Sequence, residues 1–227
     1  YYLEKAYLYQ VMENYDLMVQ NLTRADSLLT PTDRKARIYF VIGQVYQKLG
    51  FGAEAFNYYR KCIATNPDYE IDFYARLNLA QVTRIDDKEN ARSIRKQLSK
   101  MLTDEKNKEF KDKIYFEIAE FELKQGNLKI AMDNYRACLR AGTSERIKGT
   151  GYLRLGQLYY DTLRKFSLAK DFYDSAVNTL PPDTEGLANI KRRHEILSEY
   201  VEYTGTIQLQ DSLLRMAEMD TALLRIK

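Results

Sequence analysis

Histidine, cysteine, proline and tryptophan are all scarce in this sequence, and their scarcity excludes several kinds of chemistry. The 227 residues include one His, two Cys, four Pro and no Trp. A single histidine cannot form a multi-histidine metal site, and the two cysteines do not have the spacing of zinc ligands. Two cysteines are also too few for a disulfide framework in a chain of this length. We therefore expect a protein without a metal or other cofactor.

Catalytic motifs are missing as well. The sequence has no P-loop, no G-x-G-x-x-G fingerprint and no G-x-S-x-G elbow. The carboxylate pairs Glu117/Glu120 and Asp86/Asp87 are typical of surface charge, and the second pair falls in a predicted turn. The one histidine, His194, stands on the apolar stripe of a predicted helix, so we interpret it as a packed side chain. We expect no enzymatic activity and no small-molecule substrate.

Charge and hydropathy exclude two further classes of partner. The formal net charge is +3, from 35 basic and 32 acidic residues that interleave along the chain. Nucleic-acid binders concentrate basic residues on one face, whereas only Lys191-Arg192-Arg193 is locally basic here, which is typical of a solvated helix. No window reaches the 18 apolar residues of a membrane-spanning helix. Because the sequence opens with Tyr1 rather than Met, we interpret it as part of a longer chain, with any membrane anchor upstream.

A repeated helix–turn–helix pattern dominates what is present. Residues 38–67 contain aromatic, small and turn-forming residues at regular sites. Numbered from Ala36, sites 4, 7, 8, 11, 15, 20, 24, 27 and 32 hold Tyr39, Ile42, Gly43, Tyr46, Gly50, Ala55, Tyr59, Cys62 and Pro67. This set resembles the tetratricopeptide repeat (TPR) consensus of about 34 residues. The resemblance predicts an all-α, right-handed TPR superhelix, an α-solenoid of about five units with C-terminal capping helices.

The pattern recurs along most of the chain. We assign units to residues 1–30, 36–69, 73–106, 112–145 and 149–182, and capping helices to residues 183–227. The small residue at the eighth site is residue 6, 43, 80, 119 and 156, so successive units are 37, 37, 39 and 37 residues apart. The units are therefore about three residues overlong, which we interpret as longer second helices or longer turns. The third unit lacks most of the aromatics, and the fifth has one inserted residue before Ala169.

The repeat sites have a simple physical meaning. Small residues at sites 8 and 20 let the two helices of a unit approach closely, and large residues at sites 4, 7, 11 and 24 fill the space between helices. Gly50 and Gly126 suit left-handed turns, and Thr30-Pro31, Asn66-Pro67 and Leu180-Pro181 suit helix ends. Cys62 and Cys138 both fall at site 27, two units apart, so we expect small core residues rather than a disulfide. The signature tyrosines are predicted to be core residues: Tyr39, Tyr46, Tyr59, Tyr115, Tyr135, Tyr152, Tyr159 and Tyr173.

The stretch after Pro182 predicts two further helices, separated at Gly205. Within it, the run KRRHEILSEYVEYTGTIQLQDSLLRMAEMD, residues 191–220, resembles Bacteroidetes TPR proteins of the type IX secretion and gliding-motility machinery (the PorW/SprE family), most closely at residues 208–214. The resemblance implies a periplasmic, outer-membrane-associated lipoprotein that links components of that machinery. The alternative is a TPR adaptor of another system, in outer-membrane protein assembly or cytoplasmic signalling.

The TPR resemblance also implies where other proteins bind, because the first helix of each unit lines a concave groove. The groove sites 2, 5, 9 and 12 mix aromatics and amides with few charges, which suits an extended peptide or a helix. These sites hold Arg37, Phe40, Gln44, Gln47, Tyr74, Leu77, Gln81, Arg84, Lys113, Phe116, Glu120, Leu123, Thr150, Leu153, Gln157 and Tyr160. We expect a protein-binding scaffold whose partners contact either some of these groove residues or the C-terminal helices.

Overall fold

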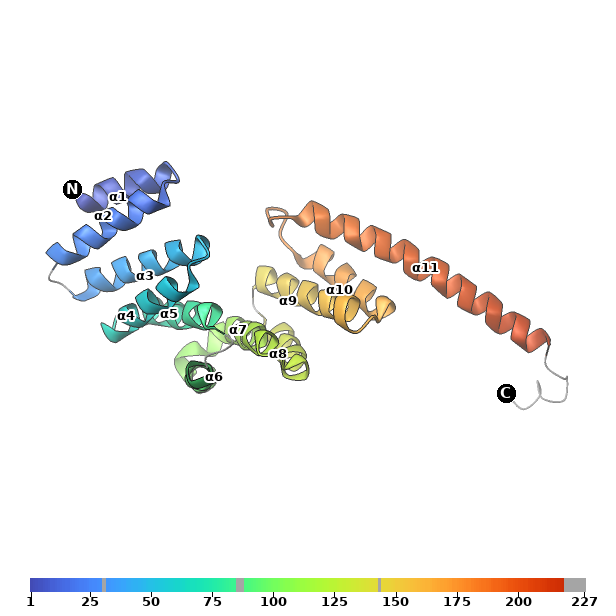
Figure 1. Ribbon diagram of the computed structural model, residues 1–227. Helices are drawn as coiled ribbons and strands as arrows, with labels where there is room; N and C mark the ends of the chain where they lie inside the picture. Colours follow the sequence, from blue (N-terminus) through green and yellow to red (C-terminus); the bar gives the residue numbers. More distant parts are fainter. Residues whose placement is uncertain (30–31, 85–87, 143, 219–227) are drawn as a thin grey trace. The chain divides into compact units, whose positions relative to one another are not determined.

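The computed structural model describes residues 1–29, 32–84, 88–142 and 144–218, and its chain divides into two compact units, Tyr1–Asn134 and Tyr135–Lys227. In the described residues the regular structure is helical throughout (Figure 1). The expected all-α fold built of successive helix pairs is confirmed. None of the described helices is both long and apolar enough to cross a membrane.

The first unit is a run of antiparallel helix pairs. Neighbouring helices pack in chain order, and the first helices of successive pairs, α3, α5 and α7, also contact one another. The elements are α1 (Tyr2–Val11), α2 (Tyr15–Leu28), α3 (Thr32–Lys48), α4 (Gly52–Ala64), α5 (Tyr69–Val82), α6 (Lys88–Thr103), the 3-10 helix η1 (Glu105–Phe110), α7 (Lys111–Lys124) and the first half of α8 (Leu128–Ala141).

The second unit contains the end of α8, one further pair and a long final helix. These elements are α9 (Glu145–Gln157), the π-helix η2 (Leu158–Thr162), α10 (Phe166–Thr179) and α11 (Leu187–Ala217). The two helices expected after Pro182 are in fact one helix of 31 residues, so the break predicted at Gly205 is wrong. A glycine inside a helix is only about 1 kcal/mol less favourable than alanine, and the good helix formers on both sides of Gly205 outweigh that.

The turns predicted from glycine and proline have the expected geometry. Gly50 and Gly126 have φ of 82° and 79°, the left-handed conformation that ends α3 and α7. Asn66, just before Pro67, has φ 51° and follows the end of α4. Leu180 is extended, with ψ 133°, as expected before a proline. The Thr30-Pro31 turn lies outside the described residues.

Close contacts between small and large residues hold the helix pairs together. A Cβ added to Gly43 would lie 2.7 Å from Tyr59 Cε1, and one added to Gly156 would lie 3.0 Å from Tyr173 Cδ2. These are sites 8 and 24, so the predicted fit of a small residue against a large one is confirmed in both pairs. Within the described residues Cys62 and Cys138 form no disulfide, and both are fully buried. Of the signature tyrosines, those that are buried are Tyr59, Tyr135, Tyr159 and Tyr173; the others are half-buried.

Irregular helical turns accommodate the irregular spacings of the sequence. The longest spacing, from residue 80 to residue 119, contains the 3-10 helix η1. The inserted residue of the fifth repeat, residues 149–182, is taken up by η2. There the Leu163 N–H donates to the carbonyl of Leu158, five residues back, at 3.0 Å. A π turn holds one more residue than an α turn. Ala169, Tyr173 and Ala176 are therefore buried in the pattern expected without the insertion.

Candidate protein-binding surfaces

The predicted groove residues of the first unit differ widely in accessibility. Arg37, Gln44 and Arg84 are exposed, whereas Leu77 is only 4% exposed. The expectation that Leu77 is an accessible groove residue is therefore wrong, because it belongs to the hydrophobic core of this unit. The remaining predicted residues of this unit are half-buried: Phe40, Gln47, Tyr74, Gln81, Lys113, Phe116, Glu120 and Leu123.

A chain of hydrogen bonds crosses the three first helices α3, α5 and α7. Gln47 Nε2 donates to Gln81 Oε1 at 2.6 Å, and Gln81 Nε2 donates to Glu117 Oε1 at 2.6 Å. At the other end, the Tyr59 hydroxyl donates to Gln47 Oε1 at 2.6 Å. The same hydroxyl accepts a hydrogen bond from Asn78 Nδ2 at 3.3 Å. We call Tyr59, Gln47, Asn78, Gln81 and Glu117 the polar ladder. Two predicted contact residues, Gln47 and Gln81, are thus engaged inside the fold.

The end of the polar ladder is a buried carboxyl group. Glu117 is 8% exposed, so its interpretation as surface charge is wrong. Burial is the main reason that its pKa rises to about 7; the nearby Glu120 raises it further, while the Gln81 hydrogen bond and Lys124 lower it. The Lys124 ammonium group also donates to the Gln81 carbonyl. The pair Asp86/Asp87 lies outside the described residues.

Two aromatic residues of the predicted groove are likewise engaged in packing. The Phe40 ring centroid is 6.0 Å from that of Tyr59. Tyr74 packs edge-on against Phe73 at 5.3 Å, and its hydroxyl receives a hydrogen bond of 2.7 Å from Lys113 Nζ. Of the predicted groove residues in Tyr1–Asn134, the exposed ones are thus the polar residues Arg37, Gln44 and Arg84.

In the second unit, the predicted residue Tyr160 opens onto an apolar pocket. The pocket has a volume of about 310 Å³ and is lined by Tyr160, Phe166, Arg193, Ile196, Leu197 and Tyr200. Phe166 stands edge-on to both Tyr160, at 5.5 Å, and Tyr200, at 5.1 Å. The Arg193 guanidinium lies 5.9 Å from the Tyr160 ring centroid. The other predicted residues, Gln157, Thr150 and Leu153, are half-buried, and Gln157 accepts a hydrogen bond from Arg154.

Helix α11 presents two apolar stripes that differ in burial. The helix packs on α10. Its inner stripe is half-buried apart from Leu197, which is 2% exposed, and consists of Leu187, Ile190, His194, Leu197 and Val201. On that stripe His194 is half-buried, as expected, and bonds to Asp174 of α10. The outer stripe consists of Ile196, Tyr200, Tyr203 and Ile207, which are 60%, 48%, 68% and 56% exposed. Their spacings of 4, 3 and 4 residues place them on one side of the helix.

The sequence indicated the C-terminal helices as the alternative binding surface, but the outer stripe was not recognised there, because only one apolar series was assigned to the helix after Pro182. The signal was present in the sequence, since residues 190–207 carry two interleaved apolar series rather than the one that a surface helix needs. Such accessible apolar patches are typical of protein interaction sites. Arg193, interpreted as part of a solvated basic run, is exposed as expected and also lines the pocket.

One of the comparisons with known proteins, the family model, agrees with the repeat pattern. Residues 36–69 match the family model described as tetratricopeptide repeat. A crystal structure of a TPR repeats protein from Bacteroides fragilis NCTC 9343 is similar, with 17% identity over 88% of this chain and 97% of that chain, and a TM-score of 0.36. No curated protein matches the chain. The chain thus has a tetratricopeptide repeat at residues 36–69 within an all-α fold of helix pairs, which indicates a protein-interaction scaffold.

Proposed function

We propose that this scaffold holds a helical segment of a partner protein along the outer stripe of α11. The observation that carries the proposal is the exposure of Ile196, Tyr200, Tyr203 and Ile207 beside the pocket at Tyr160. An amphipathic helix buries its apolar stripe against another such stripe at the same 3–4 spacing. The pocket gives the partner a place for one apolar side chain, which fixes its register.

Paired variants of α11 test this proposal. Tyr203→Glu with Ile207→Glu places two charges on the outer stripe, and Gln208→Glu with Ser212→Glu places the same charge on exposed positions of another side. We expect the first pair to abolish partner crosslinks in cells, as measured by mass spectrometry, and the second pair to preserve them. Circular dichroism should show equal helix content in both. Partner crosslinks that survive in the first pair would refute the surface.

We further propose that the scaffold belongs to the type IX secretion and gliding machinery and lies in the periplasm at the outer membrane. The support is the resemblance of residues 191–220 to TPR proteins of that machinery, and this run lies mostly within α11. The same crosslinking experiment separates this setting from the alternatives. Secretion-machinery components are the expected partners, whereas outer-membrane assembly factors or cytoplasmic signalling proteins alone would identify an adaptor of another system.

A further inference from the structure

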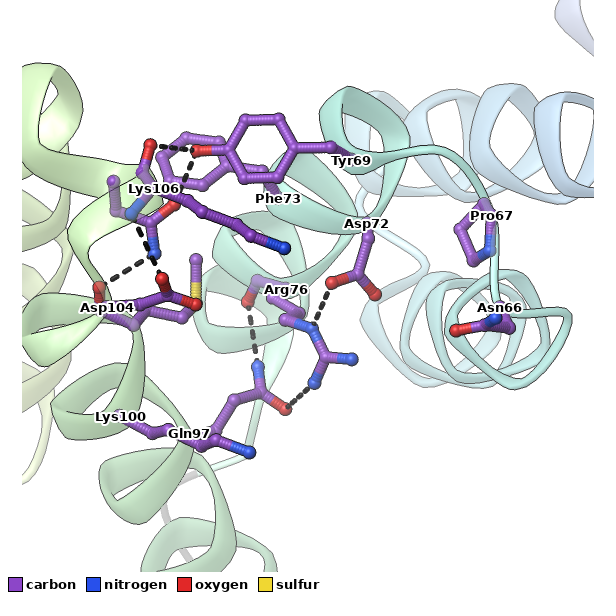
Figure 2. A pocket seen from close by; sticks show the side chains of 12 residues that line it. Asn66, Pro67, Tyr69, Asp72, Phe73, Arg76, Gln97, Lys100, Asp104 and Lys106 are labelled. Atoms are coloured by element: carbon purple, nitrogen blue, oxygen red, sulfur yellow. Dashed lines mark hydrogen bonds and ion pairs between the residues drawn. The ribbon is translucent and has the colours of Figure 1, made fainter.

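The third repeat unit replaces an aromatic residue with an arginine beside a hollow. Site 4 holds Tyr39, Tyr115 and Tyr152 in other units, but Arg76 in this one. A hollow of about 380 Å³ lies beside Arg76, between the start of α5, the end of α6 and η1 (Figure 2). We call this hollow the Arg76 pocket. All its lining residues belong to the compact unit Tyr1–Asn134, whereas α11 belongs to the other compact unit.

The Arg76 guanidinium is held in one orientation by its neighbours. Arg76 Nε donates to Asp72 Oδ2 at 2.7 Å, and Nη1 donates to Gln97 Oε1 at 3.4 Å. Gln97 Nε2 in turn donates to the Arg76 carbonyl at 3.5 Å. Within the described residues these partners leave Nη2 without a hydrogen bond. The fixed guanidinium therefore offers its Nη2 N–H groups to an anion, and hydrogen bonds from a guanidinium to a carboxylate are short and strong.

Two lysines add positive charge around the same hollow. Lys100 of α6 and Lys106 of η1 line it, and both are exposed. In Figure 2 the Lys106 side chain extends across the hollow toward Arg76. The described residues provide no ion pair to either ammonium group. The carboxylates present are already engaged, since Asp72 accepts from Arg76 and Asp104 accepts from the Lys106 backbone N–H at 3.0 Å.

One wall of the hollow is aromatic. Phe73 is buried, and Tyr69 is 44% exposed. The Tyr69 hydroxyl donates to the Lys106 carbonyl at 3.0 Å and contacts Asn107, so the wall is tied to η1. Asn107 Nδ2 donates to the Met101 carbonyl at 2.7 Å. Aromatic rings of this kind pack against the methylene groups of a long side chain whose head group reaches a cation.

We propose that the Arg76 pocket binds the side-chain carboxylates of an acidic, extended segment of a partner protein. Three cationic side chains surround the hollow, and two carboxylates offset part of their charge. A singly charged carboxylate suits this balance better than a doubly charged phosphate, which Asp72 and Asp104 repel. The volume accommodates a few side chains, as a short peptide requires.

The probe is a dye-labelled, C-terminally amidated hexaglutamate peptide, with saturable binding followed by fluorescence anisotropy at low salt. We expect Lys100→Ala with Lys106→Ala to weaken binding at least tenfold. The matched control, Lys96→Ala with Lys108→Ala, removes equal charge from exposed positions outside the pocket and should change affinity less than threefold. Arg76→Lys should also weaken binding severalfold, because it keeps the charge and loses the planar fork.

Several results would overturn the assignment. Equal weakening by the two double variants would mean that only general charge attraction is at work, and absence of saturable binding would remove the site. Equal binding of amidated hexaglutamine would exclude carboxylate recognition. Binding of hexaglutamine only when its C-terminus is free would transfer the site to a terminal carboxylate. Competition by inorganic phosphate at lower concentration than acetate would assign the pocket to phosphate. Because the α11 variants lie in the other unit, loss of the α11 surface would leave these outcomes unchanged.

Discussion

Glu117 gives a titration that can be measured at the scale of one residue. Burial raises its pKa from 4.5 to about 7, so the folded state binds this proton more tightly than the unfolded state. Between pH 4.5 and pH 7 the free energy of unfolding should therefore fall as pH rises. We expect Glu117→Gln, which removes this titration, to be up to about 3 kcal/mol more stable than the parent at pH 8.5 and similar at pH 4. Urea denaturation at both pH values measures the difference.

Glu109→Gln is the matched control for this prediction, because it makes the same substitution at an exposed position. A difference for Glu117→Gln that does not grow with pH would show that the carboxyl is ionised at little cost inside the fold.

The polar ladder also makes Gln81→Glu a poor probe of partner binding in the groove, since the new carboxylate would face Glu117. Gln44→Glu is the cleaner probe, because Gln44 is exposed.

The residue-scale features differ in how far sequence predicts them. Gly43 and Tyr59 could be paired from the repeat consensus, because one backbone geometry recurs in each unit and fixes which sites meet. Gln47, Gln81 and Glu117 occupy different repeat sites, and their contacts depend on how successive units stack. No single-unit pattern encodes that stacking, so the burial of Glu117 could not be predicted.

At the scale of elements, α11 should be stabilised by removing its internal glycine. A Cβ added to Gly205 would have no heavy atom within 4 Å, and alanine is favoured over glycine by about 1 kcal/mol in a helix interior. We expect Gly205→Ala to slow amide hydrogen exchange over residues 205–217 about fivefold, because opening of this helical segment becomes less favourable. Exchange measured by mass spectrometry tests this.

Gly186→Ala is the matched control, since the same substitution falls at φ 74° at the start of α11. Left-handed geometry is unfavourable for alanine, so the first turn of α11 should exchange faster. If both substitutions slow exchange, backbone conformation does not explain either effect. The length of α11 was mispredicted because turn propensity at Gly205 is a local signal, whereas helix continuation depends on the residues that flank it on both sides.

At the scale of the whole molecule, a chain of stacked pairs should respond locally to damage. In solenoids each unit is stabilised mainly by its neighbours. Gly43→Ala forces a Cβ against Tyr59 and should speed hydrogen exchange in α3 and α4 without changing α9 and α10. Gly149→Ala in α9 forces a Cβ to 2.8 Å from Leu180 Cδ2 and should do the reverse. Overpacking of this kind destabilises by about 1–3 kcal/mol.

Uniform loss of protection from hydrogen exchange in either variant would instead indicate one cooperative folding unit.

At this scale the helix pairs themselves were predictable, because the small and aromatic sites recur at nearly constant intervals. The division into Tyr1–Asn134 and Tyr135–Lys227 was not, because its boundary falls inside α8 and leaves the repeat pattern unbroken.

The π turn of η2 shows how a repeat gene can change length by a single codon. An extra residue in a regular α-helix would rotate every later side chain by about 100°, and would bury the wrong face. Here the wider turn absorbs the addition within Leu158–Thr162, and α10 keeps its buried alanines and tyrosine. Repeat arrays can therefore accumulate single-residue insertions at the ends of their first helices and still preserve the surfaces that stack.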